Sequence, residues 1–119
     1  MDDKTLLEKA ARAAGYVVDG YVDDMIVQPS KEKAGGLVIR NEQGGHNLFN
    51  ALADDGDALR LAVDLGLVVD CSRPSAALPF TRHAYEQADY TDQKAATRRA
   101  IVRAAAAIGS AHEAQGGQP

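Results

Sequence analysis

The pattern of apolar and polar positions changes period several times along the chain, and each change predicts a boundary between elements. Residues 5–14 (TLLEKAARAA) carry Leu and Ala at helical spacing. Thr5 and Glu8 have the spacing of a capping box, and Gly15 is a typical residue after a helix end. Residues 16–28 are rich in Val, Tyr and Ile, which favours one bent strand or two short strands.

The next stretch has the pattern of a β-hairpin that follows a polar loop. Residues 29–36 (PSKEKAGG) predict the loop, and residues 36–40 (GLVIR) predict a short strand. Residues 41–45 (NEQGG) predict a turn, because both glycines can take a positive φ. We expect residues 46–49 to return as the second arm.

An amphipathic helix is predicted over residues 54–65, with Gly66 as its stop. Asp54 has a side chain suited to the N-cap position, where its carboxylate accepts hydrogen bonds from the free N–H groups of the first turn. Asp57 lies where the acid of a capping box would lie.

The following segment predicts short strands. Residues 67–71 (LVVDC) predict a strand that is buried on both faces at its start. Residues 76–80 predict an edge strand, since Pro79 cannot donate to a ladder, and residues 81–90 predict an irregular polar segment.

The last predicted element is an Ala-rich helix over residues 92–108, with Thr91 or Asp92 as N-cap and Gly109 as its end. The element order α-β-β-β-α-β-α predicts an α+β fold with a small mixed or antiparallel sheet and three helices against it. We expect one domain over residues 1–109 and a flexible C-terminal tail over residues 110–119.

Composition narrows the class of protein. The chain has 119 residues, 45% of them apolar and 25% charged, with a formal net charge of −4. This charge argues against a general nucleic-acid binder, which usually carries a basic excess. The single cysteine, Cys71, suits a reducing compartment, and no apolar run approaches the roughly 18 to 20 residues that span a bilayer. With a polar, acidic N-terminus, these features predict a cytoplasmic protein.

Acidic residues form the first candidate site. Asp54, Asp55 and Asp57 invite a magnesium or calcium interpretation, because hard cations prefer carboxylate oxygens. Helix capping explains the same residues without a metal, and the EF-hand pattern is absent. Asp23 and Asp24 would complete a metal site only if the fold brings them close. We therefore expect no metal and no cofactor.

The histidines and the cysteine give weaker signals. His46, His83 and His112 have no partner at metal-ligand spacing, although each could act as a general base near pH 7. Cys71 follows an apolar strand, where a buried inert thiol is the default interpretation. The nearby Arg73 is a single cation, which is weak evidence for a lowered thiol pKa. We expect no catalytic residue among them.

Basic residues concentrate on the last predicted helix. Lys94 and Arg98 are four residues apart, as are Arg99 and Arg103, so they form two neighbouring rows. One interpretation is a solvated face paired with acids. The other is a surface that binds an anion, because the guanidinium fork matches phosphates and carboxylates. Aromatic side chains for stacking would come from two nearby residues, Tyr85 and Tyr90.

Two segments together resemble a known family. DDGDALRLAVDLGL (residues 54–67) and AATRRAIVRAAAAIG (residues 95–109) look like the bacteriophage and prophage proteins that carry the phage ABA sandwich domain, and AAGY at residues 13–16 is similar to theirs. The resemblance covers most of residues 4–109. It implies an α-β-α layered sandwich and a phage genome context, with no established activity and no assigned catalytic residues.

The chain departs from the typical member before the acidic cap. That member has Trp-Asn-Pro-Leu where this sequence has Phe49, Asn50, Ala51 and Leu52. Phenylalanine keeps an aromatic anchor but lacks the indole N–H, so a packing role survives the change better than a ligand-binding role.

The leading hypothesis is a non-enzymatic phage or prophage accessory protein that acts by binding, and its specific form is an antagonist of a host defence system. Its partner would be a host protein or complex, or an anionic ligand such as a nucleotide. Two rival hypotheses are a small metal-dependent enzyme acting on nucleotides or nucleic acid through residues 54–57, and a structural homo-oligomer. The expected contact residues are Phe49, Asn50, Tyr85, Tyr90, Arg98, Arg99 and Arg103.

Overall fold

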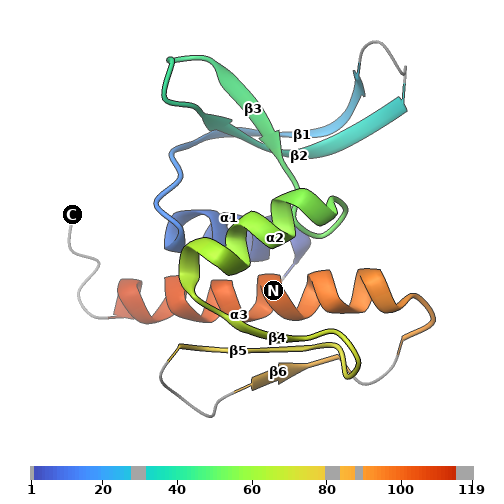
Figure 1. Ribbon diagram of the computed structural model, residues 1–119. Coiled ribbons are helices and arrows are strands. Elements are labelled where there is room, and N and C mark those ends of the chain that lie inside the picture. Colours follow the sequence, from blue (N-terminus) through green and yellow to red (C-terminus); the bar gives the residue numbers. More distant parts are fainter. Residues whose placement is uncertain (1, 28–31, 80–83, 88–89, 115–119) are drawn as a thin grey trace.

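The computed structural model describes four stretches of the chain, residues 2–27, 32–79, 84–87 and 90–114. These residues form three helices and two three-stranded antiparallel sheets, so the predicted α+β class is confirmed. The helices lie in the middle of the molecule, and one sheet covers them on each side (Figure 1).

The first helix, α1 (Asp3–Ala13), begins two residues before the predicted start. The Asp2 carboxylate accepts the Thr5 N–H at 2.8 Å, so Asp2 is the N-cap and the predicted capping box at Thr5 is wrong. This hydrogen bond also holds the pKa of Asp2 below its usual value. Gly15 follows the helix with φ 85°, a conformation in which a Cβ is strained.

The second helix, α2 (Asp55–Leu65), has the predicted limits at both ends. Asp54 is its N-cap, and its carboxylate accepts the Asp57 N–H at 2.9 Å. Gly66 ends the helix in the left-handed region with φ 65°, and its N–H donates to the carbonyl of Val63. The local sequence therefore determines this helix almost completely.

The first sheet has the order β1-β2-β3 and contains the predicted hairpin. Its strands are β1 (Val18–Val27), β2 (Glu32–Arg40) and β3 (His46–Phe49). β1 is a single strand whose register shifts twice against β2, which corresponds to the bent-strand alternative. β2 begins at Glu32, so the predicted polar loop over residues 29–36 is too long.

The second sheet has the order β4-β5-β6, and each of its strands is three residues long. β4 (Val68–Asp70) is an edge strand, and its first residue, Val68, is 65% exposed, so the predicted burial on both faces is wrong. β5 (Ser75–Ala77) is the central strand, because β6 (Ala84–Glu86) pairs with it from within the segment that was predicted to be irregular. The edge position expected for residues 76–80 is therefore also wrong.

The third helix, α3 (Gln93–Ala114), continues past its predicted end. A Cβ at Gly109 would lie 3.1 Å from the carbonyl carbon of Lys9 and closer still to the Lys9 oxygen. Gly109 therefore permits a close approach of the α1 and α3 backbones and does not end the helix. Of the expected tail, residues 110–114 are helical, and residues 115–119 lie outside the described residues.

The layer order differs from the expected α-β-α sandwich, in which one sheet lies between helices. Here the helices lie between two sheets, and α3 is buried on several sides (Figure 1). Its buried residues follow one another around the helix instead of forming a single stripe: Ala96, Ala100, Ile101, Val102, Ala104, Ala105 and Ala106. The segment from Ala100 to Ala106 is therefore covered on most of its circumference, as expected for a helical segment inside a domain. The small alanine side chains let α1 pack closely on one side of α3, and the second sheet covers another side (Figure 1).

Candidate functional site

A groove of about 940 Å³ lies between α2, β4 and the first half of α3. α2 and β4 diverge from the turn at Gly66, and α3 passes behind the opening between them (Figure 1). Apolar side chains from all three elements line the groove, among them Ala58, Ala62, Val69 and Ile101. This volume lies within the range of about 300 to 1,000 Å³ that ligand sites usually have.

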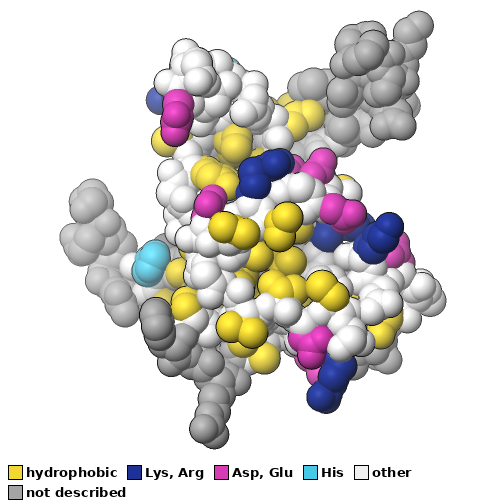
Figure 2. Space-filling view, viewed as in Figure 1, with side chains coloured by type: hydrophobic (Ala, Val, Ile, Leu, Met, Phe, Trp, Pro, Cys, Tyr) yellow, Lys and Arg dark blue, Asp and Glu magenta, His cyan; other side chains and the backbone are white. Residues whose placement is uncertain are grey.

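Large apolar side chains beside the groove extend its surface outward. Leu59 and Val63 on α2 are 64% and 69% exposed, and Val68 on β4 is 65% exposed. Leu59 also lines the groove, and Val63 follows it by one helical turn. Figure 2 shows apolar side chains gathered over this part of the molecule, with charged side chains around them. We call Leu59, Val63, Val68 and the groove the α2–β4 face.

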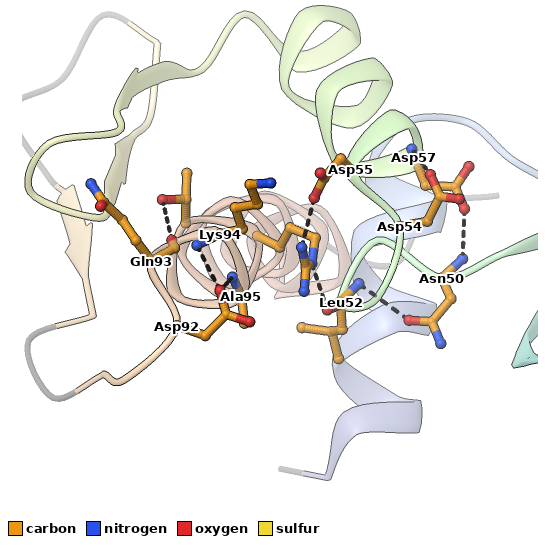
Figure 3. A network of polar contacts seen from close by, with 11 residues as sticks. Asn50, Leu52, Asp54, Asp55, Asp57, Asp92, Gln93, Lys94 and Ala95 are labelled. Atoms are coloured by element: carbon orange, nitrogen blue, oxygen red, sulfur yellow. Dashed lines mark hydrogen bonds and ion pairs between the residues drawn. The ribbon is translucent and has the colours of Figure 1, made fainter.

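The acidic residues at one end of this face are held by the fold (Figure 3). Asp54 caps α2, and Asp57 accepts the backbone N–H of Asn50 at 2.9 Å and the guanidinium of Arg60 at 2.5 Å. Asp54 as N-cap is therefore confirmed. Asp57 does not act as a capping-box acid, because its carboxylate reaches Asn50 instead of the N–H of Asp54.

Asp55 joins α2 to α3. Its carboxylate accepts a hydrogen bond from Arg98 at 2.6 Å, and the Arg98 Nε donates to the carbonyl of Leu52 at 2.9 Å (Figure 3). The Arg98 side chain is only 16% exposed. Since its donors are directed at the protein itself, this arginine holds the groove wall in place.

The start of α3 forms the polar end of the groove. The Asp92 carboxylate accepts hydrogen bonds from the backbone N–H groups of Lys94 and Ala95 (Figure 3). Of the two residues predicted as alternatives for the N-cap of α3, Asp92 is therefore the one that caps it. The Gln93 side chain donates to the carbonyl of Cys71 and ties α3 to the end of β4. The side-chain ammonium of Lys94 has no hydrogen-bond or ion-pair partner within the part of the chain that the structure describes.

The described residues hold no cluster of three His, Cys, Asp or Glu side chains with the geometry of a metal site. The side chains of Asp23 and Asp24, and the whole of His83, lie outside the described residues. His46, on β3, contacts Asp19 at 2.9 Å. His112 is exposed near the end of α3.

Asp19, Arg40 and His46 form a separate polar cluster on the first sheet. Arg40 donates two hydrogen bonds to the Asp19 carboxylate, at 2.8 and 3.1 Å. The donors from Arg40 and then His46 hold the pKa of Asp19 below its usual value. The three side chains connect the three strands of this sheet.

The predicted rows of basic residues are directed at three different elements. Arg98 contacts α2, whereas Arg99 donates to the Asp3 carboxylate on α1 at 3.1 Å. Arg103 donates to the Glu86 carbonyl on β6 at 3.2 Å and lies over the Tyr85 ring, 5.5 Å from its centroid. The structure therefore does not bring these guanidinium groups together as one anion site.

The other expected contact residues also have structural partners. Phe49 is 2% exposed and packs edge-on against Tyr16, with ring centroids 5.3 Å apart, which is the packing role expected for it. Asn50 donates to the Gly35 carbonyl at 3.0 Å and shapes the turn before α2. Tyr85 is half-buried against Arg103, and Tyr90 is 45% exposed beyond β6.

Leu59, Val63 and Val68 were missed by the sequence interpretation, although a signal was present. Five of the six residues from Ala58 to Val63 are apolar, which is more than one buried helical face requires. Such an excess indicates a second apolar face on α2.

Comparison with known proteins adds no relative: no family model, no curated protein and no solved structure matches the chain. Within the described residues, no helix has the length and apolar character needed to cross a membrane.

Proposed function

We propose that this protein acts by binding another protein through the α2–β4 face. The observation that carries the proposal is the exposure of Leu59, Val63 and Val68, each about two-thirds, next to the apolar groove. Contiguous exposed apolar surface rimmed by polar residues is typical of protein interaction sites. The partner of this proposal is a protein, and an anionic ligand is less favoured because the arginines of α3 are directed at other parts of the chain.

Covering these side chains would contribute substantially to the free energy of association. Complete burial of one such side chain is worth about 1.5 to 3 kcal/mol, so covering the exposed two-thirds of three of them contributes roughly 3 to 6 kcal/mol. That corresponds to about a hundredfold to ten-thousandfold in Kd. The face would thus act as the centre of an interface, with the surrounding charges as its rim.

The resemblance to phage and prophage proteins supports a more specific setting. In this proposal the chain is an accessory protein of a phage or prophage, acts in the host cytoplasm, and antagonises a host defence system by occupying one of its components. The argument for this setting is the likeness of residues 54–67 and 95–109 to that family, together with a surface suited to binding.

Affinity capture with matched variants tests the proposal. The tagged wild type, Leu59→Glu and Val17→Glu are incubated with lysate of a phage-infected bacterium, and the retained proteins are identified and then purified for direct binding measurements. Val17 is the control because it is 49% exposed and does not line the groove. We expect a protein that binds the wild type and Val17→Glu and is lost with Leu59→Glu.

A charge-reversed variant separates this face from the arginines. Arg99→Glu combined with Arg103→Glu should leave the captured protein bound. Loss of binding in that variant, with Leu59→Glu unaffected, would contradict the proposal. Sedimentation of the free protein addresses the homo-oligomer: a dimer that Leu59→Glu dissociates would mean that a second copy covers this face.

A further inference from the structure

The groove lies at an open edge of the second sheet. β4 pairs with β5 on one side, and no further strand pairs with its other side among the described residues. β4 and the residue after it, Cys71, line the groove, whereas β5 and β6 contribute no lining residue. The groove is therefore located beside the β4 edge, where main-chain N–H and C=O groups face outward and favour pairing with another chain.

The opposite wall and the floor leave room for incoming side chains. α2 forms the wall that faces β4, and its lining residues include the small Ala58 and Ala62. On β4, Val69 lines the groove, and its neighbour Val68 is exposed on the same edge strand. The groove therefore has α2 on one side and, among the described residues, an unpaired strand edge on the other, so an added strand would find main-chain partners and apolar contacts there.

The charges of the lining decide which side chains fit. Asp55 is paired with Arg98, and the formal charges of Asp92 and Lys94 also cancel, so the lining has no net charge. The rest of the lining is mainly apolar. Away from the polar end at Lys94, an inserted carboxylate or ammonium would lose water without gaining a free counter-charge, whereas an uncharged apolar side chain matches this lining.

We infer that the groove receives an extended, uncharged apolar segment of the protein partner, which adds to β4 as a further strand and inserts alternate side chains against α2. Main-chain hydrogen bonds to β4 supply affinity, and the floor of the groove selects side chains by size. The inference rests on the proposed function, because it names the part of the partner that the α2–β4 face recognises. A helical segment fits less well, since its own hydrogen bonds would leave the β4 edge unpaired.

A displayed library of random peptides tests this inference with the intact protein as target. Peptides of about seven residues are used, because that is close to the length of a typical strand. We expect selected peptides to carry apolar residues at every second position and no charge at those positions. Their binding to Leu59→Glu should be at least about tenfold weaker, and their binding to Val17→Glu unchanged.

Methylation of single peptide nitrogens in a selected sequence then tests the strand pairing itself. An added strand donates every second N–H to its neighbour, so methylation should weaken binding at least about tenfold at alternate positions only. Selected peptides with helical spacing, or a loss of binding without a two-residue period, would overturn the inference. If captured proteins still depend on Leu59 in that case, the proposed function remains and only the strand addition is rejected.

A second copy of this chain is the remaining candidate occupant of the groove. If no peptide is selected and the free protein sediments as a dimer that Leu59→Glu separates, both the inference and the protein partner are rejected. If no peptide is selected and the protein is a monomer, the strand addition alone is rejected.

Discussion

Replacing Gly109 with alanine should destabilise the protein, although alanine is the better helix former. In an exposed helix interior this substitution stabilises by roughly 1 kcal/mol. Here the added Cβ would lie 3.1 Å from the Lys9 carbonyl carbon and closer to the oxygen, so α1 and α3 must move apart. Overpacking of this kind costs about 1 to 3 kcal/mol, and a backbone neighbour cannot rotate away as a side chain can.

Because the added Cβ would clash with backbone atoms, we expect the upper part of this cost, about 2 to 3 kcal/mol. After the gain of roughly 1 kcal/mol, the net loss in the free energy of unfolding should be about 1 to 2 kcal/mol. Urea unfolding followed by circular dichroism measures this value, and the denaturant slope should stay unchanged. Ser110→Ala, at the next position of the same helix, is the control and should change stability by no more than about 0.5 kcal/mol. A Gly109→Ala variant as stable as the wild type would refute the close approach of the two helices.

Three further predictions follow from the polar contacts. Arg98→Ala should cost about 1 to 3 kcal/mol of unfolding free energy, measured by urea unfolding, because the Leu52 carbonyl loses its donor; a neutral effect would contradict the structural role. Asp19 has a lowered folded pKa, so its contribution is present above its unfolded pKa and is lost as the pH falls through the folded value. Melting temperatures of the wild type should therefore fall more steeply with acid than those of Asp19→Asn, and parallel curves would reject the cluster with His46. Asp54→Ala should cost about 0.5 to 2 kcal/mol through the lost cap, and magnesium should not shift the melting of either protein; saturable stabilisation by the metal would favour the enzyme hypothesis.

Local signals predicted the parts of the fold that depend on local interactions. The limits of α2 followed from Asp54 and Gly66, because a cap and a left-handed glycine act within one turn. The hairpin of β2 and β3 followed from the glycine-containing turn between them. These elements need no knowledge of the rest of the chain.

Features that depend on distant neighbours could not be predicted in the same way. Gly109 has the same local signal whether it ends a helix or lies against another backbone, and only the position of Lys9 distinguishes the two. β5 became a central strand because β6 forms from a segment without a clear strand pattern. The division of the strands into two sheets likewise depends on which distant elements pack against α3, and the local sequence does not reveal that packing.

The same limit applies to the candidate site. The sequence identified Arg98, Arg99 and Arg103 as a group, since helical spacing places them near one another. Their partners lie on three other elements, which no spacing within α3 can reveal. Leu59 and Val63 were not identified as exposed for a related reason, because the count of apolar residues on α2 does not say how many sides of the helix are covered.

Amide hydrogen exchange of the protein, free and saturated with its captured partner, tests the central claim most directly. If the α2–β4 face is the contact surface, added protection should concentrate in α2, β4 and the first turns of α3, and β4 should gain the slowest amides. Protection confined to β1–β3, or to the second half of α3, with α2 and β4 exchanging as in the free protein, would contradict the account.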